Sequence, residues 1–255
     1  IAIGSFTLDA MTTGANNVAV GYDAGTAINT GLSNVLIGYG AGTLLTDNTG
    51  NIAIGQAALD GCNGGENYNV AIGHYALSAD IIGADGCVAI GASALLSQSV
   101  ADANNVAIGF EAAKALTSGT DSVYMGYLAG GVGVITGDLN VAIGKNAALN
   151  ATSVFIGAQS GGAGVITGTA NVCVGYATGQ ALTSGASNVL IGKSAGANIA
   201  DGVQNIAIGH GALDAANGTT AGGDREDTNI AIGFNALGSE SSGSDGGVAI
   251  GDSAL

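Results

Sequence analysis

The sequence predicts an all-β protein, a parallel β-solenoid (β-roll) of about fifteen coils with 17–18 residues in most coils. A five-residue motif recurs: Asn, Val or Ile, a small residue, Ile or Val, and Gly. A short, steady period along a whole chain is typical of a solenoid with one coil per repeat. The chain also has 47 Gly and no Pro, as expected if every central strand donates to its ladder. The motif glycines are Gly4, Gly21, Gly38, Gly55, Gly73, Gly91, Gly109, Gly126, Gly144, Gly157, Gly175, Gly192, Gly209, Gly233 and Gly251.

Each motif alternates in the manner of a β-strand. Val or Ile stands three residues before the glycine in all fifteen copies, and Ile or Val stands one residue before it in fourteen, with Met125 as the exception. β-branched residues favour strands, and we expect these two columns to fill the core. The residue between them is Ala in ten copies. We expect this alanine column to face outward, covered by a neighbouring chain. Its other members are Leu36, Tyr124, Phe155, Cys173 and Leu190.

The rest of each repeat predicts a thin, flat coil. Ala stands three residues after the motif glycine in twelve copies, where it would let a second strand approach the first closely. Gly, Ser, Thr and Asn then supply the turns. The motif Asn occurs in ten of fourteen possible copies. It is either one rung of a stacked amide ladder, a turn-former before a strand, or both.

One copy carries a resemblance to known repeats. The stretch from Asn34 to Gly42, Asn-Val-Leu-Ile-Gly-Tyr-Gly-Ala-Gly, resembles repeats of phage tail-fibre proteins and of trimeric autotransporter adhesin heads (YadA-like heads). The resemblance covers all 255 residues. It implies a left-handed roll, a homotrimer about one axis, and attachment to a surface. We expect a single domain over residues 1–255, either an excerpt of a longer fibre or a unit that stacks end to end.

Composition excludes several classes. The net charge is −15, from 19 acidic and 4 basic residues, so the chain lacks the basic footprint of a nucleic-acid binder. No apolar run reaches the ~18 residues of a membrane span, and Ile1 begins within a repeat rather than a signal peptide. Cys62, Cys87 and Cys173 have no paired spacing, and we interpret them as packed small residues.

The residue after each motif glycine forms a candidate surface-recognition stripe. Exposed aromatic rings there could stack on sugar rings of a host glycan; the alternative is a cross-strand ladder or a subunit contact. The two histidines lie eight coils apart and could bind a metal only by meeting symmetry mates in a trimer. The stripe comprises Tyr22, Tyr39, His74, Phe110, Tyr127, Tyr176, His210 and Phe234, with Lys145 and Lys193 in the same column.

Two irregular intervals stand out. Between Gly209 and Gly233 the interval is 24 residues, and the extra residues predict a protruding loop with Asp224, Arg225, Glu226 and Asp227. Insertions in solenoids often serve binding. Carboxylates here, or in the acidic stretch 60–69, could hold Ca²⁺, although no EF-hand spacing supports it; otherwise we expect no cofactor. The 13-residue interval before Gly157 removes most of one turn.

No nucleophile elbow, P-loop or carboxylate pair is recognisable, so we expect no enzyme. The sequence favours a structural and adhesive segment of a viral (phage) tail fibre, extracellular, that contacts a host glycan or protein. The alternatives are a bacterial adhesin head or extracellular filament subunit, an ice-binding solenoid and a glycan-degrading tailspike. Confinement of Thr to turns counts against ice binding.

Overall fold

A computed structural model of the chain describes residues 1–61, 65–78, 83–98, 103–131, 135–147, 152–162, 166–214, 227–238 and 246–255. The chain comprises two compact units. One contains Ile1–Leu128 with Val134–Asp138, and the other contains Ala129–Gly133 with Leu139–Leu255. The expectation of a single domain over 1–255 stays a prediction.

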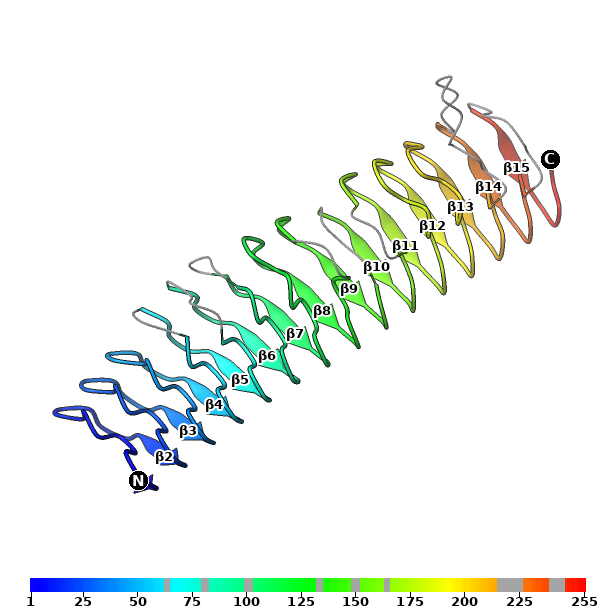
Figure 1. Cartoon of the computed structure of the whole chain (residues 1–255). Coiled ribbons are helices and arrows are strands. Elements are labelled where there is room, and N and C mark those ends of the chain that lie inside the picture. Colours follow the sequence, from blue (N-terminus) through cyan, green and yellow to red (C-terminus); the bar gives the residue numbers. More distant parts are fainter. Residues whose placement is uncertain are drawn as a thin grey trace. The chain divides into compact units, whose positions relative to one another are not determined.

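Every coil contributes one short strand, and the strands are parallel, which confirms the predicted β-solenoid. Figure 1 shows strands β2 to β8 of the first unit as arrows side by side. The first unit holds β1 (Ala2–Ile3), β2 (Val18–Val20), β3 (Val35–Ile37), β4 (Ile52–Ile54), β5 (Val70–Ile72), β6 (Val88–Ile90), β7 (Val106–Ile108) and β8 (Val123–Met125). The second holds β9 (Val141–Ile143), β10 (Val154–Ile156), β11 (Val172–Val174), β12 (Val189–Ile191), β13 (Ile206–Ile208), β14 (Ile230–Ile232) and β15 (Val248–Ile250).

The register in which neighbouring strands pair is the same whatever the length of the segment that connects them. Val154 pairs with Val141 across the 13-residue interval, and Ile232 pairs with Ile208 across the 24-residue interval. Equal motifs therefore stack on equal motifs, because a slip of one residue would turn every side chain to the other face. Insertions and deletions are absorbed in the turns.

The predicted second strand is wrong for the described residues. The segment after each motif glycine is a turn in which positive φ recurs at the second and fourth residues, as in Asp23 (φ 56) and Gly25 (φ 62). Alternating handedness prevents an extended strand. The N–H groups still bond between coils: Asp23 donates to Ser5 O at 3.1 Å and Gly25 donates to Ala41 O at 2.9 Å.

The predicted burial of the motif is also wrong, because its two faces are reversed. Ala19, Ala53 and Ala107 are 0% exposed, and so are the larger members of the alanine column such as Phe155. The flanking Val and Ile residues are half-buried or exposed, and Ile37 is 38% exposed. The coil is too thin to take large side chains from every strand position, so the small column faces the interior.

Side-chain volume in the core is matched between two columns. In each of the five copies where the alanine column holds a larger residue, the fourth residue after the motif glycine is Gly. A Cβ on Gly42 would lie 2.8 Å from the Leu36 side chain, and one on Gly196 would lie 2.8 Å from the Leu190 side chain. Where the column is Ala, as at Ala53, a leucine such as Leu59 can fill the space. Close packing requires that a larger side chain in one of these two columns be matched by a smaller one in the other.

The motif asparagines form the predicted amide ladder. All ten are buried. Asn188 Oδ1 accepts the backbone N–H of Asn205 at 2.9 Å, and its Nδ2 donates to Gly202 O at 2.8 Å. The Asn188 amide thereby satisfies a buried donor and a buried acceptor of the next coil, which would otherwise cost about 1–3 kcal/mol apiece. Asn229 satisfies only the donor, the Gly247 N–H, because its own Nδ2 has no hydrogen-bond partner among the described residues.

The motif glycines are required by a close approach between coils. Gly109 has φ 138, and a Cβ on it would lie 2.4 Å from Gly126 O. Gly4 to Gly91 and Gly144 to Gly233 repeat this geometry at each motif glycine, and Gly233 faces Gly251 O. A side chain here would both adopt a strained backbone conformation and strike the next coil.

Candidate functional site

The outward face of the strands is an apolar surface without charged residues. The two β-branched columns supply a side chain on each side of every buried alanine-column residue, and all are Val, Ile or Met125. In the first unit, β2 to β8 at roughly 4.8 Å per strand give a face on the order of 400 Å². A patch of this size equals the largest apolar patch of a typical monomer, which is often functional. We call these two columns the outer face.

The stripe borders the outer face, directly after the motif glycine. All eight of its predicted members are exposed, from Tyr22 at 44% to Tyr39 at 59% among the tyrosines. Backbone bonds keep the members in one column: Gly40 donates to Tyr22 O at 2.9 Å and Ala57 donates to Tyr39 O at 2.9 Å. The sequence therefore placed the stripe on the surface correctly, while its role in recognition stays a prediction.

Neighbouring rings of the stripe pack on one another. Tyr22 and Tyr39 are stacked with centroids 5.3 Å apart and planes 8° apart, and Phe110 and Tyr127 are stacked at 5.5 Å and 10°. Phe6 adds an edge contact to Tyr22 at 5.6 Å. These pairs are the cross-strand ladder that the sequence left open as an alternative. A ring inside a stacked pair has one face covered, so only its other face can receive a ligand.

The second unit carries a more polar stretch of the stripe. Tyr176, Lys193, His210 and Phe234 occupy four successive coils, and all four are exposed. His210 meets the Phe234 ring edge-on at 5.3 Å. Burial raises the pKa of the nearby Asp214 carboxyl, and the charge of His210 opposes that rise. His74 lies in the first unit, where it contacts Tyr75 at 4.2 Å.

Most of the predicted protruding loop lies outside the described residues, since Asp224, Arg225 and Glu226 fall between 214 and 227. Asp227 is described. Its Oδ1 accepts the Val203 N–H at 2.8 Å, and its carbonyl accepts the Gly246 N–H at 3.0 Å. Asp227 thus links neighbouring coils, as Asp138 does when it accepts the Thr120 N–H at 2.9 Å. The carboxylates of Asp227 and Asp138 therefore stabilise the stacking of neighbouring coils.

The acidic stretch 60–69 shows a similar pattern. Glu66 is fully buried, and its carboxylate accepts Asn48 Nδ2 at 2.8 Å and the Gly83 N–H at 3.0 Å. Burial raises the pKa of the Asp60 carboxyl. Within the described ranges, no three His, Cys, Asp or Glu side chains are grouped so that they could hold a metal ion.

Cys87 and Cys173 are buried free thiols, as the sequence predicted, and Cys62 lies outside the described residues. Burial raises the pKa of Cys87 to about 11 and that of Cys173 to about 12. Such thiols are poor nucleophiles at neutral pH, because the thiolate is the reactive form. The part of the chain that the structure describes has no helix that is both long and apolar enough to span a membrane.

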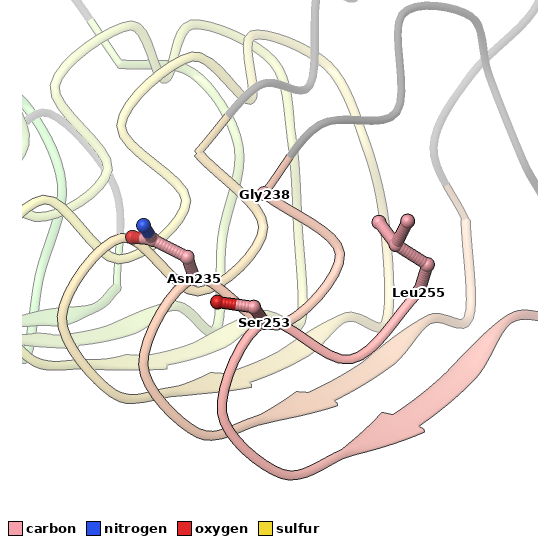
Figure 2. A pocket seen from close by; sticks show the side chains of 4 residues that line it. All are labelled: Asn235, Gly238, Ser253 and Leu255. Atoms are coloured by element: carbon pink, nitrogen blue, oxygen red, sulfur yellow. The ribbon is translucent and has the colours of Figure 1, made fainter.

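A pocket of about 270 Å³ lies beside the turns that follow β14 and β15 (Figure 2). Asn235, Gly238, Ser253 and Leu255 line it. These residues offer an amide and a hydroxyl but no acid or base, and Asn235 and Ser253 have positive φ as part of the regular turn. The lining therefore gives no catalytic arrangement.

Searches of protein-family models, curated proteins and solved structures find no match to this chain. The functional surface is therefore defined by the geometry of the chain itself. Sequence reasoning missed the outer face because it assigned these residues to the core. The signal that could have found it is the pairing of large alanine-column residues with Gly four residues after the motif glycine, as for Leu190 and Gly196.

Proposed function

We propose that the protein is a structural and adhesive fibre segment whose chains associate through the outer face, as a homotrimer or a longer fibre. The single observation that carries the proposal is the partial exposure of Val and Ile on every strand, which reaches 37–38% at Ile37, Ile191 and Ile208. Burial of apolar surface is the main driving force for association.

A second copy of the chain is the occupant that fits best. At a net charge of −15, copies repel one another unless their contact excludes acids. Neither β-branched column contains a charged residue in any of the fifteen copies. The face repeats at one coil spacing, so an identical face can match it along its whole length. Isologous or cyclic packing of identical faces is the usual route to homo-oligomers.

The carrier we propose is an extracellular viral tail fibre, with attachment to a host surface glycan or protein as its role. The motif resemblance from Asn34 to Gly42 and the exposed stripe support this proposal. A bacterial adhesin head or filament subunit shares both supports and is the second candidate. Catalysis has no place in the proposal. A glycan-degrading tailspike would need carboxylates facing each other in a groove, and the described carboxylates such as Asp227 and Glu66 serve turns.

The test is the mass of the chain in solution, measured by light scattering after size-exclusion chromatography. We expect three times the chain mass of 24.2 kDa. The double variant Ile54→Glu with Ile108→Glu places carboxylates on the outer face and should give single chains with unchanged circular dichroism. Ser118→Glu adds a charge in an exposed turn instead and should leave the mass unchanged. A natural chain of 24.2 kDa would overturn self-association, and a dimer would overturn the trimer alone.

A further inference from the structure

Ala92 interrupts the stripe between two larger exposed residues. His74, Ala92 and Phe110 occupy three successive coils. Ser93 donates its N–H to His74 O at 2.9 Å, and Glu111 donates to Ala92 O at 2.9 Å. These bonds hold the three residues in one column. Ala92 is half-buried, whereas His74 and Phe110 are exposed. The column thus carries a methyl group where its neighbours carry rings, and we call this missing ring position the gap.

The width of the gap matches one six-membered ring. His74 and Phe110 are separated by two coils, or roughly 9.6 Å at ~4.8 Å per strand. A ring at the level of Ala92 would lie about 4.8 Å from each neighbour. The stripe already stacks rings at this spacing, since Tyr22 and Tyr39 are 5.3 Å apart and Phe110 and Tyr127 are 5.5 Å apart.

The two walls of the gap differ in chemistry. Phe110 lies parallel to Tyr127, within 10°, so one face of its ring is covered and the opposite face is directed toward the level of Ala92. Phe110 is 48% exposed. The other wall is the His74 imidazole, packed at 4.2 Å against Tyr75. The gap thus lies between an apolar ring and a ring that can donate and accept hydrogen bonds.

We propose that this gap binds one hexopyranose ring of a surface glycan, with Phe110 as the apolar platform and His74 as the hydrogen-bonding partner. The inference rests on the attachment role proposed above and names its substrate class and its residues. A pyranose has a C–H face for the phenyl ring and hydroxyl groups for the imidazole. An aromatic side chain of a second copy would match Phe110 but leave the imidazole without a polar partner. Because the gap is open to solvent, a single sugar binds in the millimolar range.

The experiment uses saturation-transfer NMR on the full chain with three probes: methyl β-galactoside, methyl α-glucoside and methyl α-mannoside, each at millimolar concentration. All proteins carry Ala158→Phe, which closes the other alanine gap of the stripe, between Lys145 and Tyr176. In this background we expect saturation transfer to the C–H protons of at least one probe. Ala92→Phe should reduce it at least fivefold by filling the gap, and Phe110→Ala should do so by removing the platform.

Two controls keep the result interpretable. The stripe already accepts Phe at Phe110 and Phe234, so Ala92→Phe should fold, as its circular dichroism will report. Tyr68→Ala removes an exposed aromatic ring outside the stripe and should leave the transfer unchanged. Absence of transfer from all three probes, or transfer that survives Ala92→Phe, overturns the inference. Free monosaccharides report on the gap alone, so this result is independent of the mass measurement that tests fibre assembly.

Discussion

The two faces of each motif strand have opposite relations to residue size. The inward face carries Ala in ten of fifteen copies, as at Ala107, which is 0% exposed, and a larger residue in the other five. The outward face carries β-branched side chains such as Ile108, which remains partly exposed. Hydrophobicity alone therefore does not tell which face of a strand is inside. The interior takes a large side chain from the strand only where a Gly leaves room for it, as Gly42 does for Leu36. The β-branched residues of every strand lie outside, where they are available to a partner.

The largest expected effect comes from Ala107→Glu. The variant buries a carboxylate in the space of a methyl group, so we expect a loss of more than about 4 kcal/mol of stability and local or complete unfolding. The measurement is urea denaturation followed by far-ultraviolet circular dichroism. Ile108→Glu, one residue away on the outer face, is the matched control and should lose less stability than Ala107→Glu, because it affects only the contact between chains and buries no carboxylate inside the coil. A greater loss in Ile108→Glu than in Ala107→Glu would contradict the assignment of the two faces.

Gly109→Ala should follow, with a loss of about 3 kcal/mol, because φ 138 is strained for Ala and the new Cβ meets Gly126 O. Gly65→Ala separates the two causes. Gly65 also has positive φ (93), but among the described residues its Cβ would have no neighbour nearer than 3.8 Å. The control should cost about 1 kcal/mol in the same denaturation experiment. Equal losses would mean that the close approach of the glycine columns contributes nothing.

Asn188→Ala tests the inner amide ladder, and we expect it to cost roughly 2 kcal/mol. It leaves the Asn205 N–H and the Gly202 carbonyl without their present partners. Asn188→Ser should lose less, because Ser153 Oγ already accepts the Asn171 N–H at 3.1 Å elsewhere in the ladder. Thermal unfolding midpoints of the two variants provide the comparison. Equal midpoints for Ala and Ser would show that the accepted hydrogen bond is not the stabilising feature.

An effect similar in size to that of Asn188→Ala is a pH dependence at the inward face. Burial raises the pKa of Cys173 to about 12, whereas a thiol in the unfolded chain titrates near 8.5. Between pH 9 and 10.5 the folded chain therefore binds more protons than the unfolded chain, and the free energy of unfolding falls as pH rises, by about 1.4 kcal/mol per pH unit. Over this window the loss is roughly 2 kcal/mol.

Cys173→Ala gives the control for this titration, since Ala occupies the same position in ten copies. Denaturation midpoints at pH 9 and 10.5 should differ less in the variant than in the natural chain, with the tyrosine contributions cancelling in the comparison. An equal fall in both proteins would mean that the Cys173 thiol is not protected by the fold.

The sequence by itself determined the period, the position and type of every strand, the register, the amide ladder and the exposure of the stripe. These follow from local regularities: alternation in Val18 to Val20, the Asn before it and the Gly after it recur at a fixed spacing. Parallel stacking of identical units leaves one register that pairs them all. The additional strand expected around Ala24 was wrong because sequence spacing does not reveal alternating φ.

Only the tertiary structure decided which face of the strand is inside. Alternation along a strand defines two faces but does not tell which of them is buried. Burial depends on how much space the folded coil leaves between its strand and the segment opposite the strand. The residues that fit in the interior are determined by contacts between a strand residue and a turn residue of the same coil, as where the Leu36 side chain lies over Gly42. The outer face, and the gap at Ala92 between His74 and Phe110, exist because residues 17–18 apart in sequence stand next to each other in successive coils. Their spacing is a property of the stacked sheet, which no single repeat contains.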